Sequence, residues 1–216
     1  MRTSFTVSLF VVLFLAVGGI WGGVISVTQF SVTTCSGTPP QTCEQAAWTP
    51  SGVAGSLLPA AGTWSGAIPD GGPQVGSTNA GSLTQDLGTA LLANETYTFT
   101  VWVSSRVGLA FDPDIVLEAG STPLITWTAA GTQGPAPNDD HTNNLYNWVE
   151  WTGTYTSPAS GAPVGQDLEI VLGSTAAQTD FDEVSLTDSS AVPEPAMFML
   201  VGAGLLGLVT RRRFAK

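Results

Sequence analysis

The fold class is decided by the stretch Glu95-Thr96-Tyr97-Thr98-Phe99-Thr100-Val101-Trp102-Val103-Ser104. Large apolar residues alternate in it with threonines, and successive side chains of a β-strand point to opposite faces. One face therefore carries Tyr97, Phe99, Val101 and Val103, and the other carries Thr96, Thr98, Thr100 and Trp102. The pattern predicts a strand over 95–104 whose first face lies in the core.

The rest of the central region has the same character. Short apolar runs are separated by Gly, Pro, Asn and Ser, and helical periodicity is nearly absent. Further strands are predicted over 25–33, 82–87, 114–119, 124–128, 148–156, 166–173 and 179–187. Together these make about eight antiparallel strands, a number typical of a jelly-roll β-sandwich. We therefore expect an all-β fold.

The last predicted strand contains an irregularity. Phe181, Val184 and Leu186 can all face the core only if a β-bulge lies near Asp182-Glu183. The sequence therefore predicts a bulge at that position.

Charge is distributed unevenly along the chain. The formal net charge is −11, and Arg106 is the one basic residue between Arg2 and Arg211. The central region is therefore anionic and would repel a phosphate backbone, so we expect no nucleic-acid partner. Neutral sugars, cations or positively charged surfaces are compatible with this charge, and so is an acidic surface that serves solubility alone.

The N-terminal residues 1–23 have the pattern of a signal peptide. Arg2 precedes a short apolar run that ends in small residues. Ala16 and Gly18 offer a small-x-small cleavage site, with Gly22-Gly23 as a competing one. The alternative is an uncleaved membrane anchor.

The C-terminal residues 191–216 have the order of a stop-transfer element. Val192-Pro193-Glu194-Pro195 precedes an apolar run over 196–209, and Arg211, Arg212 and Arg213 follow. A helix of about fourteen residues would span about 21 Å, less than the hydrocarbon core of about 30 Å, so this is a short transmembrane helix. The arginines would stay cytoplasmic and leave the body of the protein outside.

These three parts, in this order, resemble the PEP-CTERM sorting signal. The resemblance implies that Pro193, Glu194 and Pro195 form the recognition motif for an exosortase, with the apolar helix and Arg211–Arg213 holding the precursor in the inner membrane. It also implies delivery to the cell surface or the extracellular space. The alternative is an ordinary tail anchor. The predicted organisation is a signal peptide over 1–23, one domain over 24–190 and a sorting segment over 191–216.

The central region is similar to the galactose-binding-like jelly rolls that occur in PEP-CTERM proteins. The resemblance is carried by the segments 69–71, 82–87, 94–101, 148–155 and 181–186. Those segments are mostly packing and turn elements, so the resemblance implies a fold and no particular ligand.

Two cysteines, Cys35 and Cys43, lie close together in a polar stretch. In an exported chain they are candidates for a disulfide, with free thiols as the alternative. Their spacing does not match a zinc site, and the single His141 does not complete one.

No catalytic constellation stands out. His141 lies in a polar loop without a G-x-S-x-G motif near it, and no two carboxylates are marked as a glycosidase pair. We therefore predict that the protein is not an enzyme, with a secreted hydrolase as an alternative.

A structural calcium ion is the chemical hypothesis for the acidic loops. The segments 112–114 and 138–140 offer hard oxygen ligands, and Asp182 is a candidate ligand by analogy with the resembled jelly rolls. No D-x-[DN]-x-[DN]-G loop is present, so turn formation and solubility are the favoured explanation of these acids.

Seven tryptophans raise the hypothesis of sugar stacking. Trp64 and Trp127 lie near Gly-rich turns and are the candidates for exposed sugar contacts, whereas Trp148 and Trp151 have opposite parity, so one of them should face solvent. The favoured alternative is that these aromatics are core residues.

These expectations combine into one functional hypothesis. We expect a non-catalytic exported protein of the cell surface or extracellular matrix, processed by an exosortase and associated with exopolysaccharide or biofilm. A carbohydrate-binding module with a specific sugar ligand is the alternative, and filament formation through an edge strand is a further one.

Overall fold

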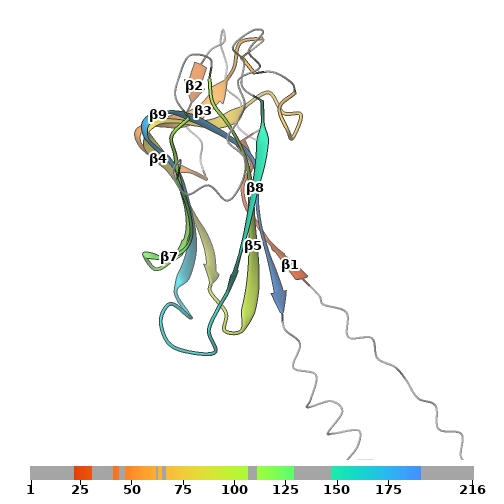
Figure 1. Ribbon diagram of the computed structural model, residues 1–216, viewed down its shortest axis with the longest axis vertical. Helices are drawn as coiled ribbons and strands as arrows, with labels where there is room; N and C mark the ends of the chain where they lie inside the picture. Colours follow the sequence, from red (N-terminus) through yellow and green to blue (C-terminus); the bar gives the residue numbers. More distant parts are fainter. Residues whose placement is uncertain are drawn as a thin grey trace, which may run out of the picture. The chain divides into compact units, whose positions relative to one another are not determined.

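The computed structural model describes residues 22–30, 41–43, 47–61, 63–64, 67–106, 111–128 and 147–190, which belong to the unit Trp21–Ala191 (Figure 1). These residues form strands and no α-helix. The strands are β1 Gly22–Ile25, β2 Gln41–Cys43, β3 Thr49–Leu58, β4 Val75–Ala90, β5 Glu95–Ser104, β6 Pro113–Ala119, β7 Thr122–Thr128, β8 Val149–Thr156 and β9 Asp167–Ser190.

The long strand β9 organises the sheet. On one edge it pairs with β4 and then with β1, and on the other edge with β6 and then with β5. β3 extends the sheet from β4, β2 extends it from β3, β7 pairs with β6, and β8 pairs with β5, all antiparallel. Figure 1 shows that β7 and β4 lie in one layer and β1, β5 and β8 in the other, with β9 running through both. The all-β antiparallel sandwich predicted from the sequence is confirmed.

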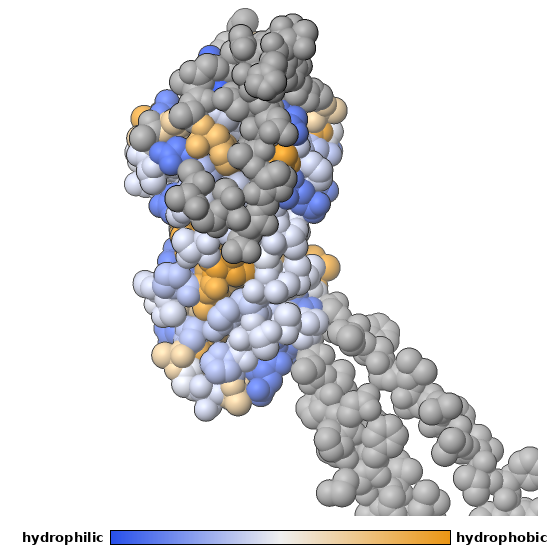
Figure 2. Space-filling view, in the orientation of Figure 1, coloured by the Kyte–Doolittle hydropathy of each residue, from blue (hydrophilic) through white to orange (hydrophobic). Residues whose placement is uncertain are grey.

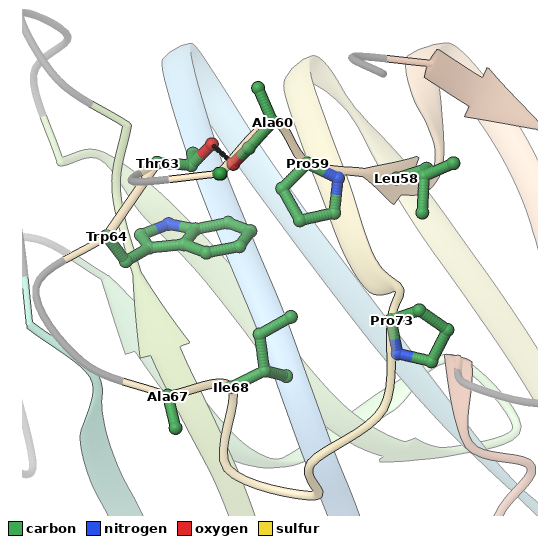
Figure 3. Close-up of a pocket in the computed structure, with 9 residues that line it drawn as sticks. Leu58, Pro59, Ala60, Thr63, Trp64, Ala67, Ile68 and Pro73 are labelled. Atoms are coloured by element: carbon green, nitrogen blue, oxygen red, sulfur yellow. Dashed lines mark hydrogen bonds between the residues drawn. The ribbon is translucent and has the colours of Figure 1, made fainter. Parts of the chain in front are cut away.

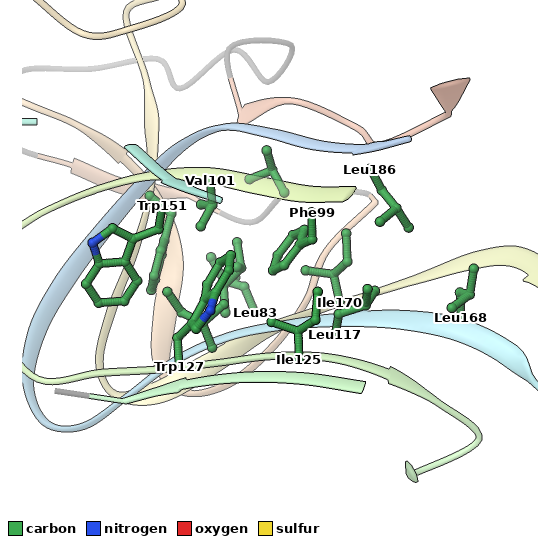
Figure 4. Close-up of a cluster of buried hydrophobic side chains, with 14 of the residues drawn as sticks. Leu83, Phe99, Val101, Leu117, Ile125, Trp127, Trp151, Leu168, Ile170 and Leu186 are labelled. Atoms are coloured by element: carbon green, nitrogen blue, oxygen red, sulfur yellow. The ribbon is translucent and has the colours of Figure 1, made fainter. Parts of the chain in front are cut away.

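The main core fills the space between the two layers. Tyr97, Phe99, Val101 and Val103 of β5 are all buried, as predicted. The Phe99 ring stacks on Trp127 with centroids 5.0 Å apart, and Trp127 packs edge-on against Trp151 (Figure 4). Figure 2 shows apolar residues between the layers on the side where β7 and β8 form the sheet edges.

Several strand boundaries differ from the predictions. The strands expected over 166–173 and 179–187 form one continuous strand, because pairing with β4 resumes at Gln178 after a shift in register that follows Ser174. The strand expected over 25–33 ends at Ile25, and β2 and β3 were not predicted. β3 contains a proline and two glycines without clear alternation, so its pairing with β4 stabilises a segment of low intrinsic strand propensity.

The predicted bulge in β9 is confirmed. Thr100 pairs with Ser185 and Trp102 pairs with Asp182, so β9 has one more residue between these pairs than β5. Glu183 has a φ of 45°, and Phe181, Val184 and Leu186 are all buried. The extra residue restores the apolar face after the bulge.

The two ends of the chain lie mostly outside the described residues. These include 1–21 and the predicted C-terminal helix over 196–209. Within the described part of the chain, no helix is long and apolar enough to cross a membrane. β1 begins at Gly22, and the Gly23 N–H donates to Asp188 Oδ1 at 2.7 Å, so Gly22 and Gly23, which were assigned to the signal peptide, pair with β9.

Candidate active site

Two acidic side chains of β9 lie on the face opposite the main core. Asp180 and Asp182 flank Phe181, which points into that core, and alternation along the strand directs both acids to the other face. Both aspartates have an exposed fraction of 0%. Carboxyl groups are rarely this buried without a specific role, so the pair marks a candidate site.

A second apolar cluster covers this face of the sheet. It consists of Leu57, Trp64, Val75 and Trp148, with Ile68 and Trp102 packed against it. The Trp64 and Trp148 rings lie 5.1 Å apart, and Trp102 is the strand partner of Asp182. The acids therefore lie in a tryptophan-rich environment that excludes water.

Asp180 is held by side-chain hydrogen bonds. Its Oδ2 accepts from Trp64 Nε1 at 3.3 Å, its Oδ1 accepts from Gln178 Nε2 at 2.9 Å, and Ser77 also bonds to it. Burial raises the pKa of Asp180 to about 6, and these hydrogen bonds and the charge of Arg106 oppose the rise.

Asp182 has a different set of partners. Its Oδ2 accepts from the Asp70 backbone N–H at 3.0 Å, whereas its buried Oδ1 has no hydrogen-bond partner. Burial raises the pKa of Asp182 to about 7, backbone N–H groups oppose the rise, and the charges of Asp70 and Glu183 add to it. A large share of Asp182 is therefore protonated at neutral pH, and its buried Oδ1 is not used by any protein hydrogen bond.

A pocket of about 400 Å³ lies beside Trp64. It is lined by Leu58, Pro59, Ala60, Ala61, Thr63, Trp64, Ala67, Ile68 and Pro73 (Figure 3). The one hydroxyl among these residues, on Thr63, donates to the Ala60 carbonyl oxygen at 2.6 Å. The pocket therefore presents mainly apolar side chains beside the face that carries the two acids.

The prediction that Trp64 and Trp127 are exposed is wrong. Trp64 packs on Trp148 and bonds to Asp180, and Trp127 is enclosed by Phe99 and Trp151. Trp148 and Trp151 are also both buried, contrary to the parity argument, because apolar clusters cover both faces of the sheet at this point. The candidate sugar contacts lack the exposure on which they depended.

The described residues contain no cluster of side chains that could bind the proposed calcium ion. Within the described ranges, no group of three or more His, Cys, Asp or Glu side chains could hold a metal ion at Asp182 or elsewhere. Asp112 instead accepts a hydrogen bond from the Thr175 hydroxyl, and residues 138–140 lie outside the described part. Calcium binding stays a prediction.

Other predicted site residues have separate outcomes. Cys43 ends β2 and is not a free thiol, but Cys35 lies outside the described residues, so their disulfide stays a prediction. The sorting residues Pro193–Pro195 and Arg211–Arg213 also lie outside them. Asp180 was not singled out from the sequence, although its spacing of two residues from Asp182 places both acids on one face of the strand.

Comparison with known proteins gives two family matches. Residues 191–213 match the PEP-CTERM protein-sorting motif, so the chain carries the signal for export through an exosortase to the cell surface. Residues 26–187 match the HpiC1-like family, described as HpiC1 cyclase. Among curated proteins, no relative matches the chain.

Several solved structures with a similar fold are described as cyclases. The Stig cyclase Fisc from Fischerella sp. TAU, in complex with (3Z)-3-(1-methyl-2-pyrrolidinylidene)-3H-indole, is 19% identical with a TM-score of 0.61, covering 79% of this chain and 100% of that chain. An apo form cyclase from Fischerella sp. is 19% identical with a TM-score of 0.60, covering 78% and 97%. A cyclase from Fischerella sp. TAU in complex with 4-(1H-indol-3-yl)butan-2-one is 21% identical with a TM-score of 0.57, covering 78% and 98%. At these identities the likeness shows a shared fold.

The family match corrects one prediction. The protein was expected not to be an enzyme because no triad or marked carboxylate pair appears in the sequence, but its central region matches a cyclase family. A single buried carboxylic acid can act as a proton donor without a histidine or a nucleophile, so the absence of a triad was the wrong test. Over residues 26–187, the chain belongs to the HpiC1-like cyclase family.

Proposed function

We propose that the protein is an exported cyclase that closes a ring in an apolar, aromatic substrate, with Asp182 as the proton donor. The observation that carries this proposal is the buried Oδ1 of Asp182, which has no hydrogen-bond partner beside a tryptophan-rich cluster. Membership of a cyclase family supports it.

The proposed chemistry is an acid-initiated isomerisation. The protonated Asp182 transfers its proton to an unsaturated carbon of the substrate, and a neighbouring carbon becomes electron-deficient. A π-bond elsewhere in the same molecule attacks that carbon and forms the new carbon–carbon bond. Loss of a proton then restores a neutral product and returns the proton to the carboxylate, so no co-reactant is consumed.

The surrounding tryptophans suit the charge that develops in this reaction. Trp102 is opposite Asp182, and Trp64 and Trp148 belong to the same cluster. Indole faces stabilise a nearby cation and exclude water, which would otherwise capture the electron-deficient carbon.

The proposed substrate class is an indole that carries an unsaturated side chain. Two similar cyclase structures hold indole compounds, and the apolar lining of the pocket beside Trp64 would accept a hydrocarbon group of this kind. The test uses the full-length chain and a panel of alkenyl indoles, with ring-closed product measured by mass spectrometry after chromatography.

The matched variants are Asp182→Asn and Asp167→Asn. The first keeps the shape of the proton donor without its acidity and is expected to lower turnover by about a hundredfold or more. The second changes an exposed acid of the same strand and should leave turnover unchanged. Full turnover by Asp182→Asn would exclude the assigned role.

We also propose that exosortase processing places this enzyme in the exopolysaccharide matrix, with an inner-membrane precursor. The sorting motif over residues 191–213 supports the proposal. Intact mass and cell fraction, with and without Pro193–Pro195, provide the test. A tail that stays in the membrane regardless of the motif would contradict it.

Sugar binding is not favoured as a second function. A stacking platform needs an exposed aromatic face. Among the tryptophans that the structure describes, Trp48, Trp64, Trp127, Trp148 and Trp151 are buried, and Trp102 is partly buried.

A further inference from the structure

The two buried acids of β9 differ in how their oxygens are used. Both oxygens of Asp180 accept hydrogen bonds from side chains, from Trp64 and Gln178. Asp182 is held by backbone N–H groups, with its Oδ2 accepting from Asp70 at 3.0 Å, and its buried Oδ1 has no hydrogen-bond partner. Each oxygen of Asp180 therefore has a side-chain partner, whereas Oδ1 of Asp182 has none.

Trp64 connects Asp180 to the pocket. Its ring lines the pocket of about 400 Å³, while its Nε1 donates to Asp180 at 3.3 Å. Figure 3 shows the indole extending between Thr63 and Ile68 into the space bordered by Pro59. The orientation of one pocket wall thus depends on a carboxylate that the pocket does not contain.

The segment that carries Trp64 lies outside the strands, between β3 and β4. Two hydrogen bonds join the described part of this segment to β9. One runs from Trp64 to Asp180 and the other from Asp70 to Asp182. The other hydrogen bonds in the described part of this segment are internal, such as the one from the Gly71 N–H to the Ile68 carbonyl oxygen at 3.0 Å. The bond to Asp180 is therefore the one described hydrogen bond of the Trp64 side chain, and it acts together with the ring contact to Trp148.

We propose that Asp180 is a positioning residue that holds Trp64 as the wall of the substrate pocket, and so determines which apolar group the enzyme admits. This inference rests on the proposed cyclase function and assigns the two acids separate roles. Asp182 supplies the proton, and Asp180 shapes the binding surface. The expected ligand group is a flat aromatic or hydrocarbon group without hydrogen-bond donors or acceptors. The Thr63 hydroxyl would not bond to it, because that hydroxyl already donates within the segment.

The binding experiment uses 4-(1H-indol-3-yl)butan-2-one as the probe and isothermal titration calorimetry on the full-length chain. Asp180→Ala removes the acceptor and should weaken probe binding by about tenfold, the equivalent of one charge-assisted hydrogen bond. Asp180→Asn keeps an acceptor oxygen for Trp64 and should bind within about threefold of the wild type. Asp182→Asn should bind within about twofold but lose turnover, since its shape is unchanged.

Other results would overturn the assignment. Wild-type affinity in Asp180→Ala would show that the acid does not position the wall. Loss of turnover in Asp180→Asn with full turnover in Asp182→Asn would show that the roles are reversed. If Asp180→Ala does not fold, Trp64→Phe removes the donor and leaves the acid, and it should weaken the probe by a similar factor.

A second measurement separates this inference from the proposed function. Hydrogen–deuterium exchange of the Trp64 Nε1–H, followed by NMR, reports the bond to Asp180 without any substrate. Asp180→Ala should accelerate this exchange by about tenfold, while the Trp148 Nε1–H, which has no partner, should change little. If no probe binds the wild type but Trp64 exchange responds as expected, the proposed ligand class fails and the positioning contact stands. If Trp64 exchange does not respond, the positioning role fails.

Discussion

The side-chain amide of Gln29 makes both hydrogen bonds that a neighbouring strand would make to Val184. Gln29 Nε2 donates to the Val184 carbonyl oxygen at 2.6 Å, and the Val184 N–H donates to Gln29 Oε1 at 3.1 Å. Val184 follows the bulge of β9, where the register with β5 shifts. The amide therefore satisfies the backbone where the strand ladder cannot, two residues after Asp182.

The first prediction concerns this contact. Gln29→Ala leaves both backbone groups of Val184 without their partner and should lower the free energy of unfolding by about 2 kcal/mol. Urea denaturation of the full-length chain measures the change, with the exposed Gln166→Ala as the control. A change no larger than that of the control would mean that the amide does not support the bulge.

Stability should depend on pH through the two buried acids. The pKa values of Asp182 and Asp180 are raised from 3.8 to about 7 and about 6, so the folded state binds these protons more tightly than the unfolded state. The free energy of unfolding should therefore fall as pH rises from about 4 to about 7, and level off above it. Asp182→Asn removes one burial cost and should be more stable than the wild type at pH 8 by about 2 kcal/mol.

Thermal unfolding at pH 5 and pH 8 tests this prediction. The wild type should melt at a higher temperature at pH 5, and the difference should shrink in Asp182→Asn. Asp167→Asn controls for the loss of an ordinary acid. If the difference in melting temperature between pH 5 and pH 8 is the same in all three proteins, groups other than Asp182 cause the pH dependence.

Turnover should follow the protonated form of Asp182. A general acid with a pKa of about 7 is competent below that pH and loses its proton above it. The rate should therefore fall by about tenfold for each pH unit above about 7.5. Initial rates across pH 5–9 provide the measurement, and a rate that rises through pH 7 would instead indicate a general base.

Gly153 of β8 lies against two core residues of β7. A Cβ atom at Gly153 would lie 2.9 Å from Trp127 Cζ2 and 3.5 Å from Ile125 Cγ2. Gly153→Ala should therefore overpack the core and cost about 1 to 3 kcal/mol. Thr154→Ala, an exposed position on the same strand, serves as the control in denaturation. Stability equal to that of the control would show that Trp127 can shift.

The alternation of apolar and polar residues predicted the strands that have one face in the core. The strand over Glu95–Ser104 and the bulge beside Asp182 are confirmed because one face of each must reach the core. β3 was missed because its residues carry no periodic signal, and its strand depends on a partner distant in sequence. Exposure of Trp64 was predicted wrongly because covering of the second sheet face is a tertiary property.

The candidate site could be predicted only in part. Asp182 was selected, but as a metal ligand, because sequence does not show that its environment raises its pKa. Asp180 was not selected, since a buried acid and a surface acid look alike in a sequence. Their shared face follows from spacing, whereas their burial follows from the segment between β3 and β4.

The role of Asp182 as a proton donor is tested most directly by titrating its side chain, which the ¹³Cγ chemical shift follows in the full-length chain and Asp182→Asn assigns. A proton donor at this position should titrate with a midpoint near pH 7, and its carboxyl group should be protonated over much of the range in which an exposed aspartate is ionised. A midpoint near pH 4 would contradict this role, because Asp182 would then be an ordinary carboxylate with no proton to give to a substrate.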